Sequence, residues 1–96
     1  MPTRVFTTRT AHEDLLSIFD YIALDNPKRA ISFIEQLALR AAKILSTFPN
    51  SGARYKADLR FLTFYGYVVV YEYDEASDTA FIYNYHGAGE DWKELE

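Results

Sequence analysis

The sequence predicts an α+β domain of two layers, in which a hairpin of two helices packs on a small, mainly antiparallel sheet. Apolar residues in the first half recur at helical spacing, whereas the second half alternates and holds seven of the eight tyrosines. Connections between the later segments are too short for crossovers, so those strands must pair antiparallel. The expected order is strand, helix, helix, strand, strand, strand. Residues 1–96 are expected to form one domain, since domains usually hold about 100–150 residues.

The chain is expected to start with a short strand at Thr3–Thr8, where Val5 and Phe6 stand among threonines. Thr10 and Glu13 have the spacing of a capping box, so the first helix is expected to begin at Thr10. Its apolar face consists of residues at the spacing i, i+3, i+4 and i+7: Leu15, Ile18, Phe19 and Ile22.

A second, longer helix follows the break at Asp25. Asn26 is a suitable N-cap, and Pro27 suits the first helical position. One side of this helix is apolar and carries Ala30, Ile34, Leu37, Ala41, Leu45 and Phe48, widened by Ile31, Ala38 and Ile44. The turn residues Pro49–Gly52 end the helix. Because the link between the two helices is short, they should form an antiparallel hairpin.

Three strands are expected after this hairpin, at Leu59–Phe64, Tyr67–Tyr73 and Thr79–His86. Their alternation defines two faces, one with Val68 and Val70 and the other with Tyr67, Val69 and Tyr71. By the same alternation Arg60 lies with Leu62 and Phe64, opposite Leu59 and Phe61. The connections are a turn at Tyr65–Gly66 and an acidic turn at Asp74–Asp78, and Glu90–Leu95 is expected to form a helical turn or a tail.

Composition restricts the possible functions. The 96 residues include 14 acidic and 10 basic side chains, which give a net charge of −4 and argue against a broad phosphate-binding surface. The lack of cysteine excludes disulfides, thiolate metal sites and a cysteine nucleophile. No apolar run approaches the roughly 18 residues of a membrane span, so we expect a cytoplasmic protein without membrane contact.

His86 is a candidate for chemistry because Gly87–Gly89 and two carboxylates follow it. A histidine near carboxylates can act as a general base or bind a metal. Since no second histidine is nearby, the pattern favours a structural or interface histidine. We therefore expect no catalytic residue, no metal site and no cofactor.

The basic residues Arg54, Lys56 and Arg60 form a cluster interleaved with tyrosines. Such a pattern can hold phosphates and stack bases. The alternative is a charge lattice with Asp58, Glu72 and the acids near the C-terminus. The sequence leaves both readings open.

A pattern of short motifs extends over nearly the whole chain. It comprises Glu13-Asp14-Leu15, Ile18, Asp20-Tyr21-Ile22-Ala23, Asp25-Asn26-Pro27, Ala30, Phe33, Phe48-Pro49, Gly52, Leu59-Arg60, Gly66–Tyr71, His86-Gly87-Ala88 and Asp91-Trp92. In this order and spacing the pattern resembles the RelE/ParE superfamily of bacterial type II toxins, closest to the ParE-like branch. The resemblance implies the two-layer RelE/ParE-like fold and a toxin that is neutralised by a cognate antitoxin, which alone contacts operator DNA.

Within the superfamily, ParE-like members inhibit DNA gyrase by protein–protein contact, and RelE-like members are ribosome-dependent mRNA endonucleases. Nuclease members commonly carry an arginine where this chain has Val68, and family members often carry one where it has Ala88–Glu90. Both departures weaken the nuclease interpretation, and the second one, with the acidic tail that follows it, also leaves a weakened or inactive toxin open. The nuclease and a degenerate, non-toxic antitoxin-binding module remain the alternatives to gyrase inhibition.

The resemblance also suggests two sets of binding residues. The target-binding candidates are Arg54, Lys56, Arg60, His86, Asp91 and Trp92. The antitoxin-binding candidates are Ile31, Phe33 and Leu37 on the second helix, where the alternative is burial within the domain. An apolar antitoxin segment is expected to wrap the hairpin or to add a strand at the sheet edge.

Overall fold

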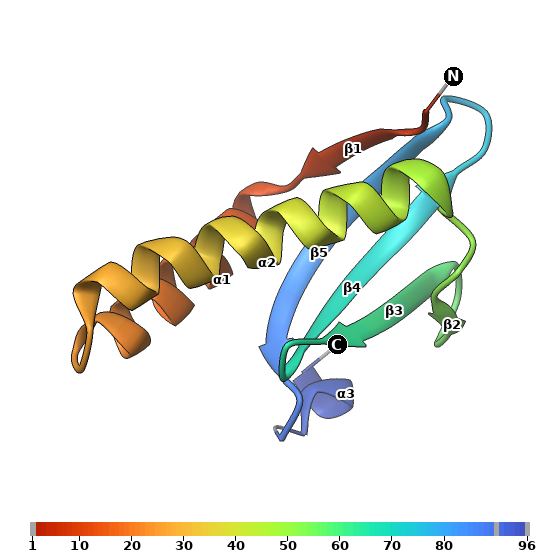
Figure 1. The fold of residues 1–96 in the computed structure, drawn as a ribbon. Helices are drawn as coiled ribbons and strands as arrows, with labels where there is room; N and C mark the ends of the chain where they lie inside the picture. Colours follow the sequence, from red (N-terminus) through yellow and green to blue (C-terminus); the bar gives the residue numbers. More distant parts are fainter. Residues whose placement is uncertain (1, 90, 96) are drawn as a thin grey trace.

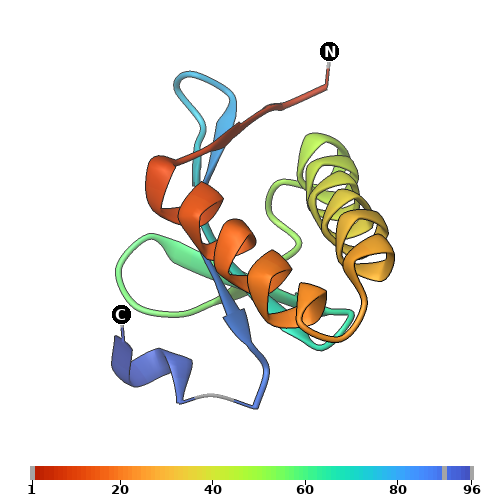
Figure 2. The same cartoon turned by 90° about the vertical axis from the view of Figure 1, so that its left-hand side faces the viewer.

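The structure, a computed structural model, describes residues 2–89 and 91–95. Its elements are β1 (Arg4–Thr7), α1 (Arg9–Ala23), α2 (Pro27–Thr47), β2 (Ala53–Arg54), β3 (Leu59–Phe64), β4 (Tyr67–Asp74), β5 (Thr79–Gly87) and α3 (Trp92–Leu95). Helices α1 and α2 lie side by side on one face of the sheet (Figures 1 and 2). None of the helices in the described residues is long and apolar enough to cross a membrane.

The sheet has the order β1-β5-β4-β3-β2. β1 pairs parallel with β5, and all other neighbours are antiparallel. The predicted two-layer α+β fold with a mainly antiparallel sheet is therefore confirmed. Strand β2 was not predicted, because two residues are too few to show a periodicity. It pairs with Arg60 and Phe61 of β3.

Helix α1 begins earlier than the capping box predicts. Its N-cap is Thr8, whose hydroxyl accepts a hydrogen bond from the amide of Ala11 (3.3 Å) and donates one to the carbonyl of Ile82 (2.7 Å). The predicted cap at Thr10 is wrong, and Glu13 pairs instead with Arg9, at 3.8 Å. Thr8 is the cap in place of Thr10 because β5 also holds its hydroxyl, through the carbonyl of Ile82.

The start of α2 confirms the predicted cap. The side-chain oxygen of Asn26 accepts from the amide of Arg29 (3.1 Å), and Pro27 occupies the first helical position. The end of the predicted apolar stripe is wrong. Helix α2 stops at Thr47, and Phe48 adopts a non-helical C-cap conformation with an exposed side chain.

The core lies between the helices and the face of the sheet toward them, which we call the inner face. Buried residues of this core come from both layers: Ala11, Leu15, Leu37, Ala41, Leu45, Val69, Tyr71, Ala80, Ile82 and Tyr85. Val68 and Val70 lie on the opposite, outer face, which confirms the predicted alternation in β4. The register between β4 and β5 shifts between Val70 and Tyr71. Val70 pairs with Asn84, whereas the next residue, Tyr71, pairs with Ile82.

The turn between β3 and β4 lies at Tyr65–Gly66, as predicted. Both residues have positive φ angles, of 54° and 80°. Positive φ at both central positions is the conformation that matches the twist of a two-residue hairpin.

The N-terminal strand is attached to the β4–β5 turn through Asp78. Its Oδ1 atom accepts hydrogen bonds from the hydroxyls of Tyr73 (2.7 Å) and Thr3 (2.8 Å). The bond from Tyr73, followed by that from Thr3, lowers the pKa of Asp78 below its ordinary value of 3.8. The carboxylate form is therefore favoured in the folded chain.

This lowered pKa predicts a pH-dependent stability. Because the pKa of Asp78 is lower in the folded chain than in the unfolded chain, its carboxylate stabilises the fold above pH 3.8. This stabilisation is lost as the pH falls through the pKa of Asp78 in the folded chain. Melting temperatures measured from neutral pH to below this value should fall less steeply for Asp78→Asn than for the wild type, because asparagine tolerates the positive φ but does not titrate. Thr3→Val, which removes one donor, should show an intermediate slope. Parallel profiles for all three proteins would contradict the role of Asp78.

Candidate functional site on the outer face of the sheet

The outer face carries a second apolar cluster, to which α3 contributes Trp92. We call it the Trp92 cluster, and it comprises Trp92, Tyr55, Leu59, Phe61, Val68 and Val70. Trp92 is only 7% exposed, and its ring centroid lies 4.9 Å from that of Phe61 and 5.3 Å from that of Tyr55. Edge-to-face packing of this kind adds to the free energy of apolar burial, so it holds the short α3 on the sheet.

Polar groups surround the Trp92 cluster. The imidazole of His86 stacks on the indole of Trp92, with ring centroids 6.2 Å apart and planes inclined by 16°. The ammonium of Lys93 lies 5.4–5.9 Å from the rings of Phe61, Trp92 and Tyr55, and that of Lys56 lies 5.6 Å from the Tyr55 ring. These distances suit cation–π attraction. The outer face therefore holds the buried ring of Trp92 between the half-buried rings of Tyr55 and Phe61, with two exposed lysines at their edge.

The two arginines predicted as target contacts lie elsewhere. Arg54 and Arg60 are cross-strand partners and line a hollow of about 290 Å³ that also holds four acidic residues, Asp58, Glu72, Asp74 and Glu75. The guanidinium of Arg60 donates to the carbonyls of Gly52 (2.9 Å) and Asn50 (3.1 Å), which fastens the loop after α2. Because carboxylates outnumber the guanidinium groups, this hollow disfavours a phosphate.

The sequence left two interpretations of the basic cluster open, and the surroundings of Arg54 and Arg60 match the charge lattice with Asp58 and Glu72. Arg54 and Arg60 share their surroundings with acids, whereas Lys56 lies at the Tyr55 ring. Of the other target candidates, the structure brings His86 and Trp92 together and leaves Asp91 exposed. Among the described residues, no group of three or more histidine, aspartate or glutamate side chains could hold a metal ion.

The antitoxin candidates on α2 differ in exposure. Ile31 is 52% exposed, and Phe33 is half-buried against the rings of Tyr67 and Tyr65. Leu37 is 0% exposed, so its prediction as a surface contact is wrong: it faces the sheet and belongs to the core. Leu39 was missed and is exposed. The apolar stripe of α2 is wider than the surface that the sheet can cover. The packing of α2 on the sheet therefore decides which apolar residues of the stripe face solvent.

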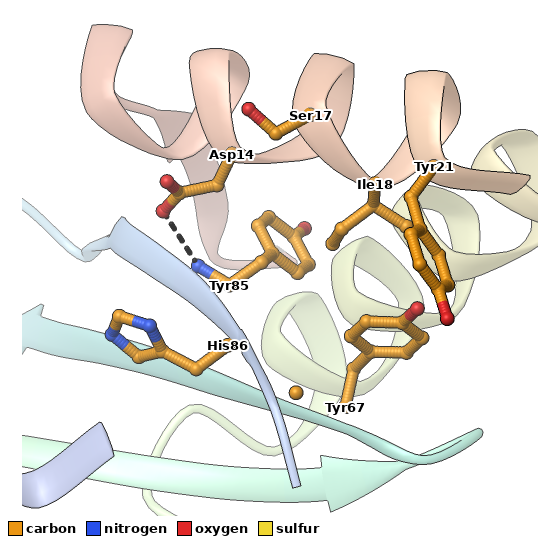
Figure 3. Close-up of a pocket in the computed structure, with 8 residues that line it drawn as sticks. Asp14, Ser17, Ile18, Tyr21, Tyr67, Tyr85 and His86 are labelled. Carbon is orange, nitrogen blue, oxygen red and sulfur yellow. Dashed lines mark hydrogen bonds between the residues drawn. The ribbon is translucent and has the colours of Figure 1, made fainter. Parts of the chain in front are cut away.

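A cleft of about 620 Å³ opens between α1 and the C-terminal half of β5 (Figure 3). Its lining comprises Asp14, Ser17, Ile18, Tyr21, Tyr67, Tyr85, His86 and Gly87. One carboxylate oxygen of Asp14 accepts from the amide of Tyr85 (3.0 Å) and from the side chain of Asn84 (3.1 Å). Asp14 thereby accepts from the backbone of β5 beyond Ile82, the last residue that pairs with β1. Sequence reasoning missed this cleft, because residues about 70 positions apart form it.

Burial raises the pKa of Tyr85 to about 12. Its hydroxyl group therefore stays protonated at neutral pH and can both donate and accept a hydrogen bond. Among the residues that the structure describes, none is hydrogen-bonded to this hydroxyl.

The fold also occurs in solved structures of toxin–antitoxin systems. A chain from the chromosomal ParDE TA system of P. aeruginosa superposes with a TM-score of 0.72 at 22% sequence identity, over 88% of this chain and 95% of that one. A chain from the toxin–antitoxin complex RelBE2 of Mycobacterium tuberculosis gives a TM-score of 0.69 at 24% identity, over 92% and 94%. At this level of identity the similarity establishes the fold.

Sequence comparison is more specific. No curated protein matches the chain. Residues 5–86 match the family described as the ParE toxin of the type II toxin–antitoxin system parDE. This match covers both helices of the hairpin and the strands from β1 to nearly the end of β5. The chain therefore belongs to the ParE toxin family of type II toxin–antitoxin systems.

Proposed function

We propose that this toxin inhibits DNA gyrase in the cytoplasm by protein–protein contact and that a cognate antitoxin neutralises it. The observation that carries the proposal is the Trp92 cluster. Its accessible part consists of the half-buried rings of Tyr55 and Phe61 with the exposed Lys56 and Lys93 beside them, and this mixture of aromatic and cationic groups has the composition of a protein–protein contact surface. The family match and the ParDE neighbour support the toxin role and the antitoxin partner in this proposal.

The charge distribution argues against the alternative, an mRNA endonuclease. Cleavage of RNA without a metal requires cations that stabilise the developing charge on the phosphate. At the position where nuclease members commonly carry arginine, Val68 packs into the Trp92 cluster. Arg54 and Arg60 share their hollow with four acidic residues, which would repel RNA.

The antitoxin site is proposed on the exposed side of α2. Ile31, Leu39 and Tyr65 are large apolar side chains that are each more than half exposed. Leu39 and Tyr65 line the same shallow hollow, together with Arg40 and Lys43. Exposed apolar surface beside polar residues is typical of protein-binding sites. In this proposal an apolar antitoxin segment covers the surface, and operator DNA is contacted by the antitoxin alone.

Controlled induction of the chain in a bacterial host that carries a DNA-damage reporter tests the target. We expect filamentous growth arrest with the reporter active, and inhibition of purified gyrase by the purified protein. Trp92→Ala should abolish both effects, because it removes the ring that holds α3 on the outer face. Leu16→Ala, at an exposed apolar position of α1 outside the cluster, is the matched control and should keep both.

Two other results would contradict the gyrase target. Growth arrest with a silent reporter and cleaved mRNA would favour the ribosome-dependent endonuclease, which the structural similarity to a RelBE2 chain keeps as the alternative. No growth effect, together with tight antitoxin binding, would indicate a degenerate binding module.

A further inference from the structure

The cleft between α1 and β5 has the form of a ligand site. Four of its residues lie at the spacing i, i+3, i+4 and i+7 on one face of α1, namely Asp14, Ser17, Ile18 and Tyr21. Tyr67 and Tyr85 close it from the sheet side (Figure 3). Its volume of about 620 Å³ lies in the range of small-ligand pockets. None of the proposed target or antitoxin contacts except His86 lines it.

The hydroxyl of Tyr85 is available for a hydrogen bond to a ligand. The side chain is 4% exposed, yet no residue in the described part of the chain is hydrogen-bonded to the hydroxyl. No fully enclosed side-chain polar atom in the described residues lacks a partner, so this oxygen is not fully enclosed, and Tyr85 lines the cleft. Figure 3 shows the hydroxyl directed toward α1 beside Ile18. A hydroxyl so deeply placed normally has a hydrogen-bond partner.

Asp14 gives the cleft a negative charge that no lysine or arginine of the described residues pairs with. Asp14 makes hydrogen bonds to Tyr85 and Asn84 but forms no ion pair with any described residue. Among the described residues that line the cleft, none is a lysine or an arginine. His86 is the other titratable group besides the tyrosines, and its ring is stacked on Trp92, outside the space between Tyr67 and α1 (Figure 3). A carboxylate beside tyrosine rings attracts a cation.

We propose that the cleft binds a lysine or arginine side chain of the antitoxin. The cationic group lies at Asp14 and donates to the hydroxyl oxygen of Tyr85, and the aliphatic stem packs on Ile18 and the ring of Tyr67. Naming the antitoxin as the source of this side chain rests on the proposed function. The net charge of −4 favours a partner with exposed basic residues.

Anionic and purely apolar ligands fit the cleft less well than a cationic side chain does. A phosphate or carboxylate would be repelled by Asp14. A purely apolar side chain would displace water from Asp14 and from the Tyr85 hydroxyl without replacing its hydrogen bonds. A cationic side chain with an apolar stem matches both the carboxylate of Asp14 and the apolar surface of Ile18 and Tyr67.

Binding of a blocked arginine amide to the full chain, followed by NMR, tests the site. Its neutral isostere, the blocked citrulline amide, is the matched probe. We expect the arginine probe to shift the amide signals of Ser17 and Tyr85 and to bind about tenfold more tightly than the citrulline probe. Asp14→Asn keeps an oxygen for the Tyr85 amide but removes the charge, so it should weaken arginine binding by about tenfold as well.

Two further variants control the assignment. Tyr85→Phe keeps the ring but removes the hydroxyl, and it should weaken the arginine probe several-fold even if Asp14→Asn perturbs the fold. Asp20→Asn removes one charge from an exposed position of the same helix, outside the cleft, and should leave binding unchanged. Equal binding of the two probes, or no shift at Tyr85 with either, would overturn the site.

The antitoxin is then tested directly. Asp14→Asn and Tyr85→Phe should weaken its binding, whereas Asp20→Asn should not. If the arginine probe binds as expected but antitoxin affinity is the same for all variants, the antitoxin is not the occupant and the proposal fails in that form. A failure of the gyrase proposal would leave these binding results unchanged, so the two failures are distinguishable.

Discussion

Replacing Gly52 with alanine should destabilise the fold by about 2–4 kcal/mol, although only one methyl group is added. A Cβ atom at this position would lie 2.6 Å from the hydroxyl oxygen of Tyr71 and 2.9 Å from the carbonyl oxygen of Phe61. The carbonyl belongs to the backbone of β3 and cannot rotate away. The tyrosine is fully buried, and its hydroxyl accepts from the Gly52 amide (2.9 Å) and donates to the Pro49 carbonyl (2.8 Å).

The added methyl group would therefore displace Tyr71 and break the hydrogen bonds that fix the loop after α2. Denaturant unfolding of the wild type and of Gly52→Ala gives the difference in the free energy of unfolding. Gly89→Ala is the matched control, because a Cβ there meets no atom within 4 Å. The denaturant midpoint of Gly89→Ala should stay close to that of the wild type. Coincident midpoints for Gly52→Ala and Gly89→Ala would show that the loop adjusts without cost.

Leu37→Ala is expected to destabilise the chain by about 2–5 kcal/mol, the usual range for truncating a leucine in a packed core. Leu37 is completely buried and lies in the cluster with Val69 and Tyr71 of the sheet. Ile31→Ala, at a position of the same helix that is 52% exposed, should change the free energy of unfolding by less than about 1 kcal/mol. The two variants thus separate the core side of α2 from its solvent side.

Antitoxin affinity provides the second measurement for this pair. Ile31→Ala should weaken binding while the toxin stays folded, since Ile31 belongs to the proposed antitoxin surface. Leu37→Ala should act mainly through stability, with a lower melting temperature for the free toxin. If Leu37→Ala unfolds no more easily than Ile31→Ala, the placement of Leu37 in the core is contradicted.

Part of the candidate site could be predicted from the sequence. His86 and Trp92 were grouped as target contacts, and the structure stacks them. Tyr55 and Phe61 were missed as their partners, although alternation in β3 already placed Phe61 on the face away from Arg60. What the alternation could not show is that Trp92, from the far end of the chain, returns to cover this face. That return depends on the path of Gly87–Gly89 rather than on any local pattern.

The sequence by itself determined the elements of this fold. Apolar periodicity, the Asn26 cap and the Tyr65–Gly66 turn place both helices of the hairpin and the three long strands within one or two residues of their observed bounds. Local patterns suffice for this, because the hydrogen bonds of helices, caps and turns join residues a few positions apart.

Only the tertiary structure decided how these elements meet. The bond between Thr8 and Ile82 moves the start of α1, packing on the sheet buries Leu37 but leaves Ile31 exposed, and Asp14 meets Tyr85 because β1 pairs with β5. Each of these outcomes depends on contacts between segments distant in the sequence. Since many pairings satisfy the local patterns equally well, close packing of the two layers selects the one that buries the core and pairs its polar groups.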